Sequence, residues 1–252
     1  MLYDSLTIEE IVDSESAQEF MKEATKLAQS WELEDIGRRL EQKSNLFSTV
    51  LSKEKIRSIT EEDLAKVAEH IFTIRRKTKR LIKANGFENI RNKLVELLYG
   101  EKKIEERFNE FVDNIDSIDM KMRINFAGDI LHFTNPDKYW LWTNWIWDPE
   151  TETGSLPLVI QDYSQLSAAS LGETYKRVGE ATILVNAVGH KVSFSNMGKG
   201  LFGTDVFLAC VYAVYMYTVF RVKLSQEFNR ILPDLVELTQ RVLGVHKMEQ
   251  VG

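Results

Sequence analysis

The chain has little of what small disulfide-bonded or zinc-stabilised domains require. Its 252 residues include one cysteine and four prolines. A disulfide needs two thiols, and zinc modules of the Cys₄ or Cys₂His₂ type need at least two, so Cys210 alone excludes both within this chain. The chain is not short of large apolar residues, as disordered proteins are: 44% of it is hydrophobic, including 13 Phe, 8 Tyr and 5 Trp. We therefore expect a folded protein of one or two domains with a sizeable core.

The chain also lacks the usual signals for export or membrane insertion. Its first residues have no cationic region followed by an apolar stretch, so we expect no secretory signal. The uncharged run 206–220 would span about 22 Å as a helix, against a hydrocarbon core of roughly 30 Å. We interpret this run as a buried core helix, with no membrane contact. A single free thiol and no export signal favour a cytoplasmic protein.

The net charge of −6 is distributed unevenly along the chain. Counted from the sequence, residues 1–35 carry −8, residues 36–100 carry +7, residues 101–120 carry −4 and the remainder carries −1. The overall negative field argues against a wholly cationic nucleic-acid binder, because it would repel phosphate at long range. A local basic surface within 36–100 is still compatible with this distribution.

Apolar residues recur at helical spacing through the first half of the chain. Ser16 and Glu19 have the spacing of a capping box at the start of a helix. Thr60 and the three acidic residues after it predict the start of a second helix. Asn85-Gly86 predicts the end of that helix. The predicted helices cover 16–31, 34–51, 61–84, 87–99, 104–115 and 122–133.

The pattern changes after Pro136. An aromatic segment occupies 139–147, and residues 181–194 are typical of a β-hairpin turning at Gly189-His190. Helices are predicted at about 205–222 and 224–243. The predicted fold is therefore mainly α, a helical bundle-like array with a small β-hairpin near residues 181–194 and a buried central helix at 205–221. We expect a helical region 1–134 and a second region 135–252, or one continuous domain.

A strongly basic face is predicted within the helix 61–84. Six of the nine residues 75–83 are cationic, and helical spacing aligns several of them. This arrangement is typical of a solvated helix end, and it also suits a surface that binds phosphate or an acidic protein. The candidate residues, together with a lysine of the later glycine-rich segment, are Arg75, Arg76, Lys79, Arg80, Lys83 and Lys199.

Four of the five tryptophans lie within eight residues of one another. A helix or a strand would place indoles on both of its faces, which indicates burial on two sides, a protein interface, or the wall of a ligand pocket. His132 lies just before this segment. The candidate ligand- or partner-binding residues are His132, Tyr139, Trp140, Trp142, Trp145 and Trp147.

The stretch from His132 to Trp142 (HFTNPDKYWLW) resembles a segment of helical, helix–hairpin–helix-like proteins of DNA repair and restriction systems. In that segment an aspartate usually follows the tryptophan, where this chain has Thr143. No Gly-x-Gly hairpin and no catalytic lysine accompanies it. The resemblance covers about fifteen of the 252 residues, and what it implies is an association with nucleic acid.

Other possible sites have simpler interpretations. Asp129 and His132 are three residues apart on a predicted helix and could face one metal ion, but two ligands do not make a metal site. The glycine-rich stretch before Thr204 precedes a helix, as phosphate-binding loops do, although Thr204 and Asp205 are also typical helix caps. Cys210 lies in mid-helix, where burial would leave its thiol inert. We therefore assign no catalytic residues and no metal ligands, and the sequence does not show whether a cofactor is bound.

Three functions stay open at this point. The first is a non-catalytic cytoplasmic binding or assembly protein, whose aromatic segment and basic face contact a protein partner or further copies of this chain. The second is a nucleic-acid-associated protein that contacts the phosphate backbone. The third is an enzyme with a small-ligand pocket under the tryptophans.

Overall fold

A computed structural model describes residues 8–223 and 233–248. Over these residues the protein is mainly helical, as the sequence predicts. The α-helices are α1 (Ile8–Ile11), α2 (Ser14–Leu27), α3 (Ser30–Val50), α4 (Glu61–Glu69), α5 (Thr78–Asn85), α6 (Phe87–Tyr99), α7 (Ile104–Asp113), α8 (Met120–Thr134), α9 (Leu171–Ala187), α10 (Gly189–Val192), α11 (Phe202–Lys223) and α12 (Leu235–Val242). Short 3₁₀ turns occur at Ile56–Ser58, Leu156–Leu158 and Ser195–Met197.

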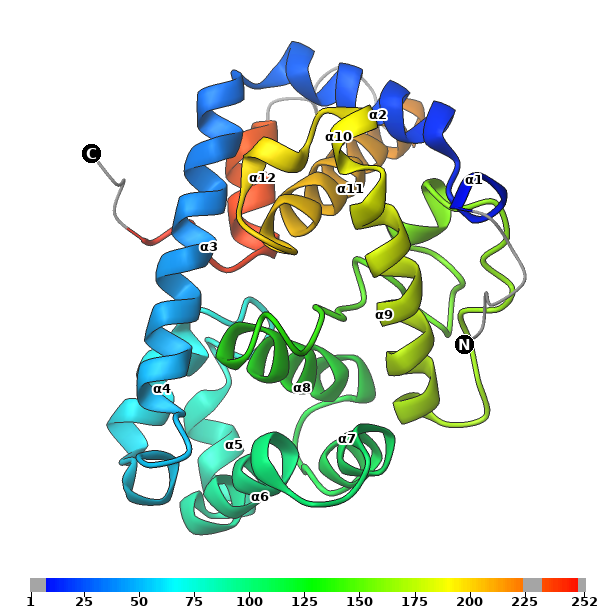
Figure 1. The fold of residues 1–252 in the computed structure, drawn as a ribbon. Helices are drawn as coiled ribbons and strands as arrows, with labels where there is room; N and C mark the ends of the chain where they lie inside the picture. The colour runs from blue at the N-terminus through cyan, green and yellow to red at the C-terminus, as the bar shows by residue number, and fades with distance from the viewer. Residues whose placement is uncertain (1–7, 224–232, 249–252) are drawn as a thin grey trace.

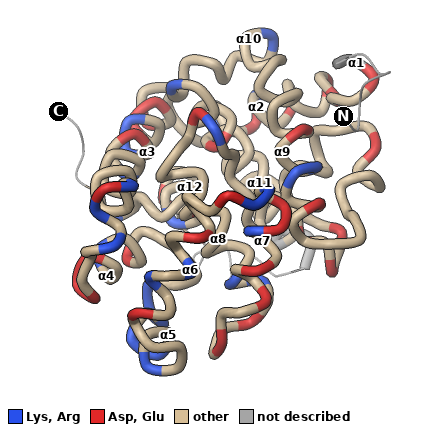
Figure 2. Tube along the Cα trace, turned by 60° about the horizontal axis from the view of Figure 1, so that its bottom comes forward, with Lys and Arg blue, Asp and Glu red and all other residues tan. Residues whose placement is uncertain are grey.

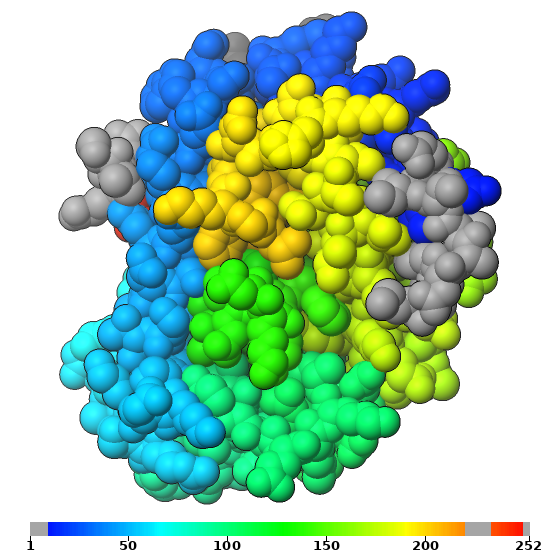
Figure 3. Space-filling view, viewed as in Figure 1, coloured from blue at the N-terminus to red at the C-terminus, as the bar shows by residue number. Residues whose placement is uncertain are grey.

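Two long helices run along opposite sides of the molecule and connect its two ends (Figure 1). Helix α3 packs against α8 and α11, and α9 packs against α7 and α11. The space-filling view shows segments from distant parts of the chain meeting on one face (Figure 3). One hydrophobic cluster includes side chains from residues before and after position 134 in the sequence. The predicted division at that residue therefore separates regions that share a core.

The apolar helix α11 lies inside the molecule. Its residues Val206–Val211 are all buried, and α2, α3, α9 and α12 pack around it. Among the described residues the window Phe202–Val219 is long and apolar enough to cross a membrane, yet 67% of it is buried within the protein. A helix that is apolar on all sides is expected in such a central position.

The predicted β-hairpin at 181–194 is wrong. This stretch forms the second half of α9 and the short α10, and the described residues contain isolated β-bridges but no strand. Helix α9 begins at Leu171 and is capped by Ser170, whose side chain accepts a hydrogen bond from the Glu173 backbone N–H. Val178, Thr182 and Val185 are buried at helical spacing along it. The β-branched residues therefore continue an established amphipathic helix.

The single helix predicted over 61–84 is interrupted. Helix α4 ends at Glu69, and residues 70–77 form turns before α5 begins. The backbone N–H groups of His70 and Ile71 bond to carbonyls three residues back, which tightens the helix end. Gly244 approaches so closely that a Cβ atom there would lie 1.9 Å from the His70 carbonyl oxygen. A contact between distant parts of the chain thus coincides with the break.

Other helix ends also differ from the predictions. Asp13, and not Ser16, caps α2, and its carboxylate accepts a hydrogen bond from the Ser16 N–H. Of the predicted helix 224–243, residues 224–232 lie outside the described residues, and the helix that follows covers Leu235–Val242 with Asp234 as its cap. The aromatic segment 139–147 is neither helix nor strand. By contrast, the predicted helix 87–99 has the bounds of α6.

Candidate functional site

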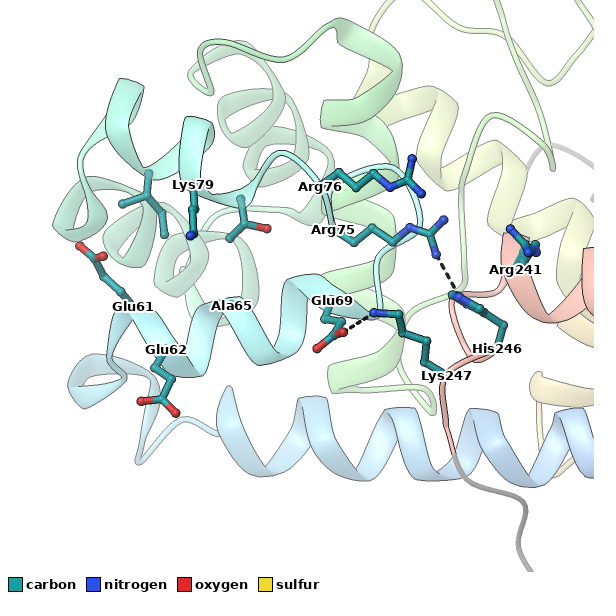
Figure 4. A pocket seen from close by; sticks show the side chains of 12 residues that line it. Glu61, Glu62, Ala65, Glu69, Arg75, Arg76, Lys79, Arg241, His246 and Lys247 are labelled. Atoms are coloured by element: carbon teal, nitrogen blue, oxygen red, sulfur yellow. Dashed lines mark hydrogen bonds and ion pairs between the residues drawn. The ribbon is translucent and has the colours of Figure 1, made fainter.

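A surface pocket of about 820 Å³ lies where α4, residues 75–82 and residues 241–247 meet (Figure 4). The last of these stretches is far from the other two in the sequence. The pocket contains more basic than acidic side chains. It is lined by Glu61, Glu62, Ala65, Glu69, Arg75, Arg76, Thr78, Lys79, Ile82, Arg241, His246 and Lys247.

Two side chains of α3 and that of His70, which follows α4, hold the C-terminal segment of the pocket through its backbone carbonyls. Lys43 Nζ donates to the Leu243 oxygen at 2.8 Å, and His70 Nδ1 donates to the Gly244 oxygen at 3.3 Å. Arg39 Nη1 donates to the Met248 oxygen at 2.6 Å. Paired carbonyls of this kind fix the path of an irregular segment. They thereby position Arg241, His246 and Lys247 next to the residues of α4 and α5.

Three arginines gather at one end of the pocket (Figure 4). Burial, together with the charges of Arg76 and Arg241, lowers the pKa of Arg75. Arg75 also lies over the Phe72 ring, 4.8 Å from its centroid. Arg241 pairs with Glu237 of its own helix, whereas Arg76 has no acidic partner within the described residues. This end therefore carries positive charge that the protein itself does not fully neutralise.

His246 lies within this cluster in its neutral form. Burial and the nearby charges of Arg75, Arg241 and Lys247 lower its pKa. Arg75 Nη1 lies 3.3 Å from His246 Nε2. Since a guanidinium donates only, Nε2 is the acceptor and Nδ1 carries the hydrogen. That Nδ1 atom is buried without a hydrogen-bond partner in the described part of the chain.

The opposite end of the pocket carries charges of both signs. Glu61 and Lys79 lie there, away from the arginines (Figure 4). Glu62 pairs with Lys66 at 3.3 Å, and between the two ends Glu69 pairs with Lys247 at 2.6 Å. The pocket is therefore strongly basic at one end and nearly balanced at the other.

The sequence predicted only part of this site. Arg75, Arg76 and Lys79 line the pocket, while Arg80 and Lys83 are exposed on α5 and do not line it. Figure 2 shows the basic positions gathered along α5. Lys199 lies elsewhere and pairs with Glu41 of α3 at 3.2 Å. Arg241, His246 and Lys247 were not predicted, because no local pattern links them to residues more than 160 positions earlier.

The aromatic segment packs mainly into the core. Tyr139, Trp142, Trp145 and Trp147 are buried, and Trp140 is half-buried and stacks on Tyr175. Phe108 stacks on Trp142 and on Tyr175. The partner-binding role suggested for these side chains stays a prediction, and their burial offers a partner little area.

The candidate metal pair Asp129 and His132 takes two different partners. Asp129 Oδ1 accepts a hydrogen bond from Lys43 Nζ at 2.6 Å. His132 Nε2 lies 2.7 Å from Asp205 Oδ2, and His132 Nδ1 donates to the Tyr139 carbonyl at 2.9 Å. All four side chains of these two pairs are buried. The part of the chain that the structure describes contains no group of three or more metal-ligating side chains.

The cap predicted at Thr204 and Asp205 is wrong, because α11 begins earlier, at Phe202. Thr204 Oγ1 donates instead to Asn186 Oδ1 at 2.8 Å, and Asp205 pairs with His132. Both residues point to partners on other helices. Burial raises the pKa of Cys210 on the same helix to about 12, so its thiol is protonated at neutral pH.

Comparison of the chain with protein-family models, with curated proteins and with solved structures finds no match. Any proposal about function therefore depends on the geometry and charge of the pocket itself.

Proposed function

We propose that this protein is a non-catalytic binding protein, and that its basic pocket holds a phosphate or similarly charged group of its partner. The observation that carries the proposal is the convergence of Arg75, Arg76 and Arg241 at one end of the pocket. Like charges held together destabilise one another, and a bound dianion would relieve that repulsion. Guanidinium groups also match phosphate oxygens in geometry.

The contacts of Arg75 also favour binding of an anion. Arg75 is partly immobilised by its contacts with Phe72 and His246, which lowers the entropy lost on binding.

The arrangement favours binding over catalysis. The hydroxyl group of Thr78 donates to the Ile74 carbonyl, so it is already engaged. His246 Nε2, the atom that would act as a base, accepts from Arg75. A nucleophile and a free base at hydrogen-bond distance are the parts that a hydrolytic or transfer site needs.

A pair of matched variants tests the proposal. Arg76→Gln removes a charge from the pocket, and Arg80→Gln removes the same charge from an exposed position that does not line it. We expect Arg76→Gln to weaken binding of inorganic phosphate, measured by isothermal titration calorimetry, by about fivefold to tenfold, and Arg80→Gln to leave it unchanged. Absence of phosphate binding by the unmodified protein at low salt would refute the proposal.

A second candidate is binding to a nucleic-acid backbone. It is favoured by Arg80 and Lys83, which continue the basic surface along α5 beyond the pocket (Figure 2). Backbone binding neutralises several phosphates at once and depends steeply on salt. It therefore predicts equal losses for Arg76→Gln and Arg80→Gln in a titration with single-stranded or duplex DNA.

A further inference from the structure

The pocket is larger than a phosphate group and has a different character at its other end. Its volume of about 820 Å³ lies within the range of sites that hold drug-sized molecules. Beyond the arginines, Ala65 and Ile82 provide an apolar surface, and Glu61 and Lys79 lie at the far end. A bound phosphate would therefore leave space for the rest of its molecule.

The far end disfavours a second strong charge on the ligand. Glu61 would repel another anionic group, whereas Glu62 and Glu69 on the same helix are paired with Lys66 and Lys247. Lys79 and the three arginines would repel a cation. A chain of phosphates such as a nucleic-acid backbone would place negative charge against these carboxylates. The charges therefore match a neutral group better than an ionic one.

Glu61 and Lys79 have no ion-pair partner within the described residues, and no ion pair joins them to each other. A carboxylate only accepts hydrogen bonds, and an ammonium only donates them. A hydroxyl group does both. Several hydroxyl groups on one carbon skeleton can therefore satisfy both side chains, while the skeleton's C–H groups contact Ala65 and Ile82.

We infer that the ligand is a phosphorylated polyol of the sugar-phosphate class, with its phosphate at the arginines and its hydroxyl groups between Glu61 and Lys79. This inference rests on the proposed function, because the arginine end must bind the phosphate first. It adds that the rest of the ligand is neutral and rich in hydroxyl groups.

Three probes separate the two proposals. Inorganic phosphate reports on the arginine end alone, n-hexyl phosphate adds an apolar six-carbon tail, and glucose 6-phosphate adds a six-carbon skeleton that carries several hydroxyl groups. We expect glucose 6-phosphate to bind the unmodified protein about fivefold to tenfold more tightly than n-hexyl phosphate, measured by calorimetry at one pH and salt concentration. The preference arises from hydrogen bonds that the hexyl chain does not make.

Variants at the far end locate that preference. Glu61→Ala and Lys79→Ala should each reduce the affinity for glucose 6-phosphate and leave the affinity for inorganic phosphate within about twofold of the original. Glu54→Ala and Lys83→Ala are the matched controls, because both side chains are exposed and neither lines the pocket. The controls should change neither affinity.

Each outcome has one meaning. If glucose 6-phosphate and n-hexyl phosphate bind equally well, the sugar-phosphate inference is wrong while phosphate binding stands. If none of the three probes binds, the proposed function fails together with the inference. A preference for glucose 6-phosphate that survives both Glu61→Ala and Lys79→Ala also overturns the inference, because the hydroxyl groups then bind elsewhere.

Discussion

The ammonium group of Lys43 lies 2.6 Å from Asp129 Oδ1, and both side chains are buried. The pair joins α3 to α8 across the interior. The same Nζ atom donates to the Leu243 carbonyl and lies 3.7 Å from the centroid of the Phe133 ring. Burial lowers the pKa of Lys43 and raises that of Asp129, and the charge and hydrogen bond of each partner oppose the shift of the other. One lysine thus connects two core helices to the segment that leads into the pocket.

Replacing this lysine should destabilise the protein severely. Lys43→Met keeps most of the side-chain volume but leaves Asp129 buried without a counter-charge. We expect the free energy of unfolding to fall by about 3–5 kcal/mol, the usual cost of breaking a buried pair from one side. Urea denaturation followed by circular dichroism measures the loss.

Two further variants give this prediction its controls. Lys43→Met combined with Asp129→Leu should recover much of the loss, because no unpaired charge is then left inside. Lys199→Met removes an exposed ion pair with Glu41 and should change stability by no more than about 0.5 kcal/mol. Equal losses for Lys43→Met and Lys199→Met would contradict the argument.

The stability that His132 contributes should depend on pH. Burial alone would lower its pKa, but the charge and hydrogen bond of Asp205 and the Tyr139 carbonyl outweigh burial and raise it. A histidine with a raised pKa stabilises the folded state fully below its unfolded pKa of about 6.5, and this contribution is lost as pH rises through the folded pKa. We therefore expect His132→Gln to cost more free energy of unfolding at pH 6 than at pH 9.

The comparison between the original protein and the variant at each pH isolates His132 from the other histidines. Burial lowers the pKa of His70 and of His246, so these two shift stability in the opposite direction on acidification. Their effect cancels in the difference. A cost of His132→Gln that is constant from pH 6 to pH 9 would show that the pKa of this ring is the same in the folded and the unfolded protein, and would contradict the prediction.

Gly128 should not tolerate a methyl group. It lies within α8, where alanine normally stabilises a helix by about 1 kcal/mol relative to glycine. A Cβ atom at this position would lie 2.1 Å from the backbone oxygen of Trp142, which the packed aromatic segment holds in place. We expect Gly128→Ala to lower the midpoint of thermal unfolding and to cost about 1–3 kcal/mol. Asn92→Ala, at an exposed position of α6, should be neutral or slightly stabilising.

Local sequence patterns were sufficient to predict the bounds of some helices and insufficient for others. Helix α6 has its predicted bounds because its apolar spacing and its flanking glycines are local signals. The break after α4 coincides with a contact to Gly244, a residue 174 positions from His70, and no local window around the break contains that contact. In α9 the run of β-branched residues favoured strand, yet the cap at Ser170 and the packing of Val178 and Val185 determined a helix.

The same distinction applies to the candidate site. Arg75, Arg76 and Lys79 could be predicted because they form a dense local run of charge. Arg241 and His246 could not, since the contacts that bring them to the pocket join residues far apart in the sequence. For the aromatic segment the sequence left burial as one of three alternatives. Which of its side chains are buried depends on packing against α8 and α9, which the sequence pattern does not show.

Anion binding should strengthen as His246 gains a proton. The lowered pKa of this ring, caused by burial and by the charges of Arg75, Arg241 and Lys247, keeps it neutral at pH 7. A proton added to His246 Nε2 places a positive charge beside the Arg75 guanidinium, and the two groups repel each other. A bound anion would offset that repulsion, so protonation and anion binding favour each other. We expect the affinity for sulfate, whose own charge is constant in this range, to increase as pH falls below about 6.5, the ordinary pKa of histidine. Calorimetric titration between pH 5 and pH 8 measures this effect, and His246→Asn should remove it. An equal increase in the His246→Asn variant would assign the pH dependence to another group.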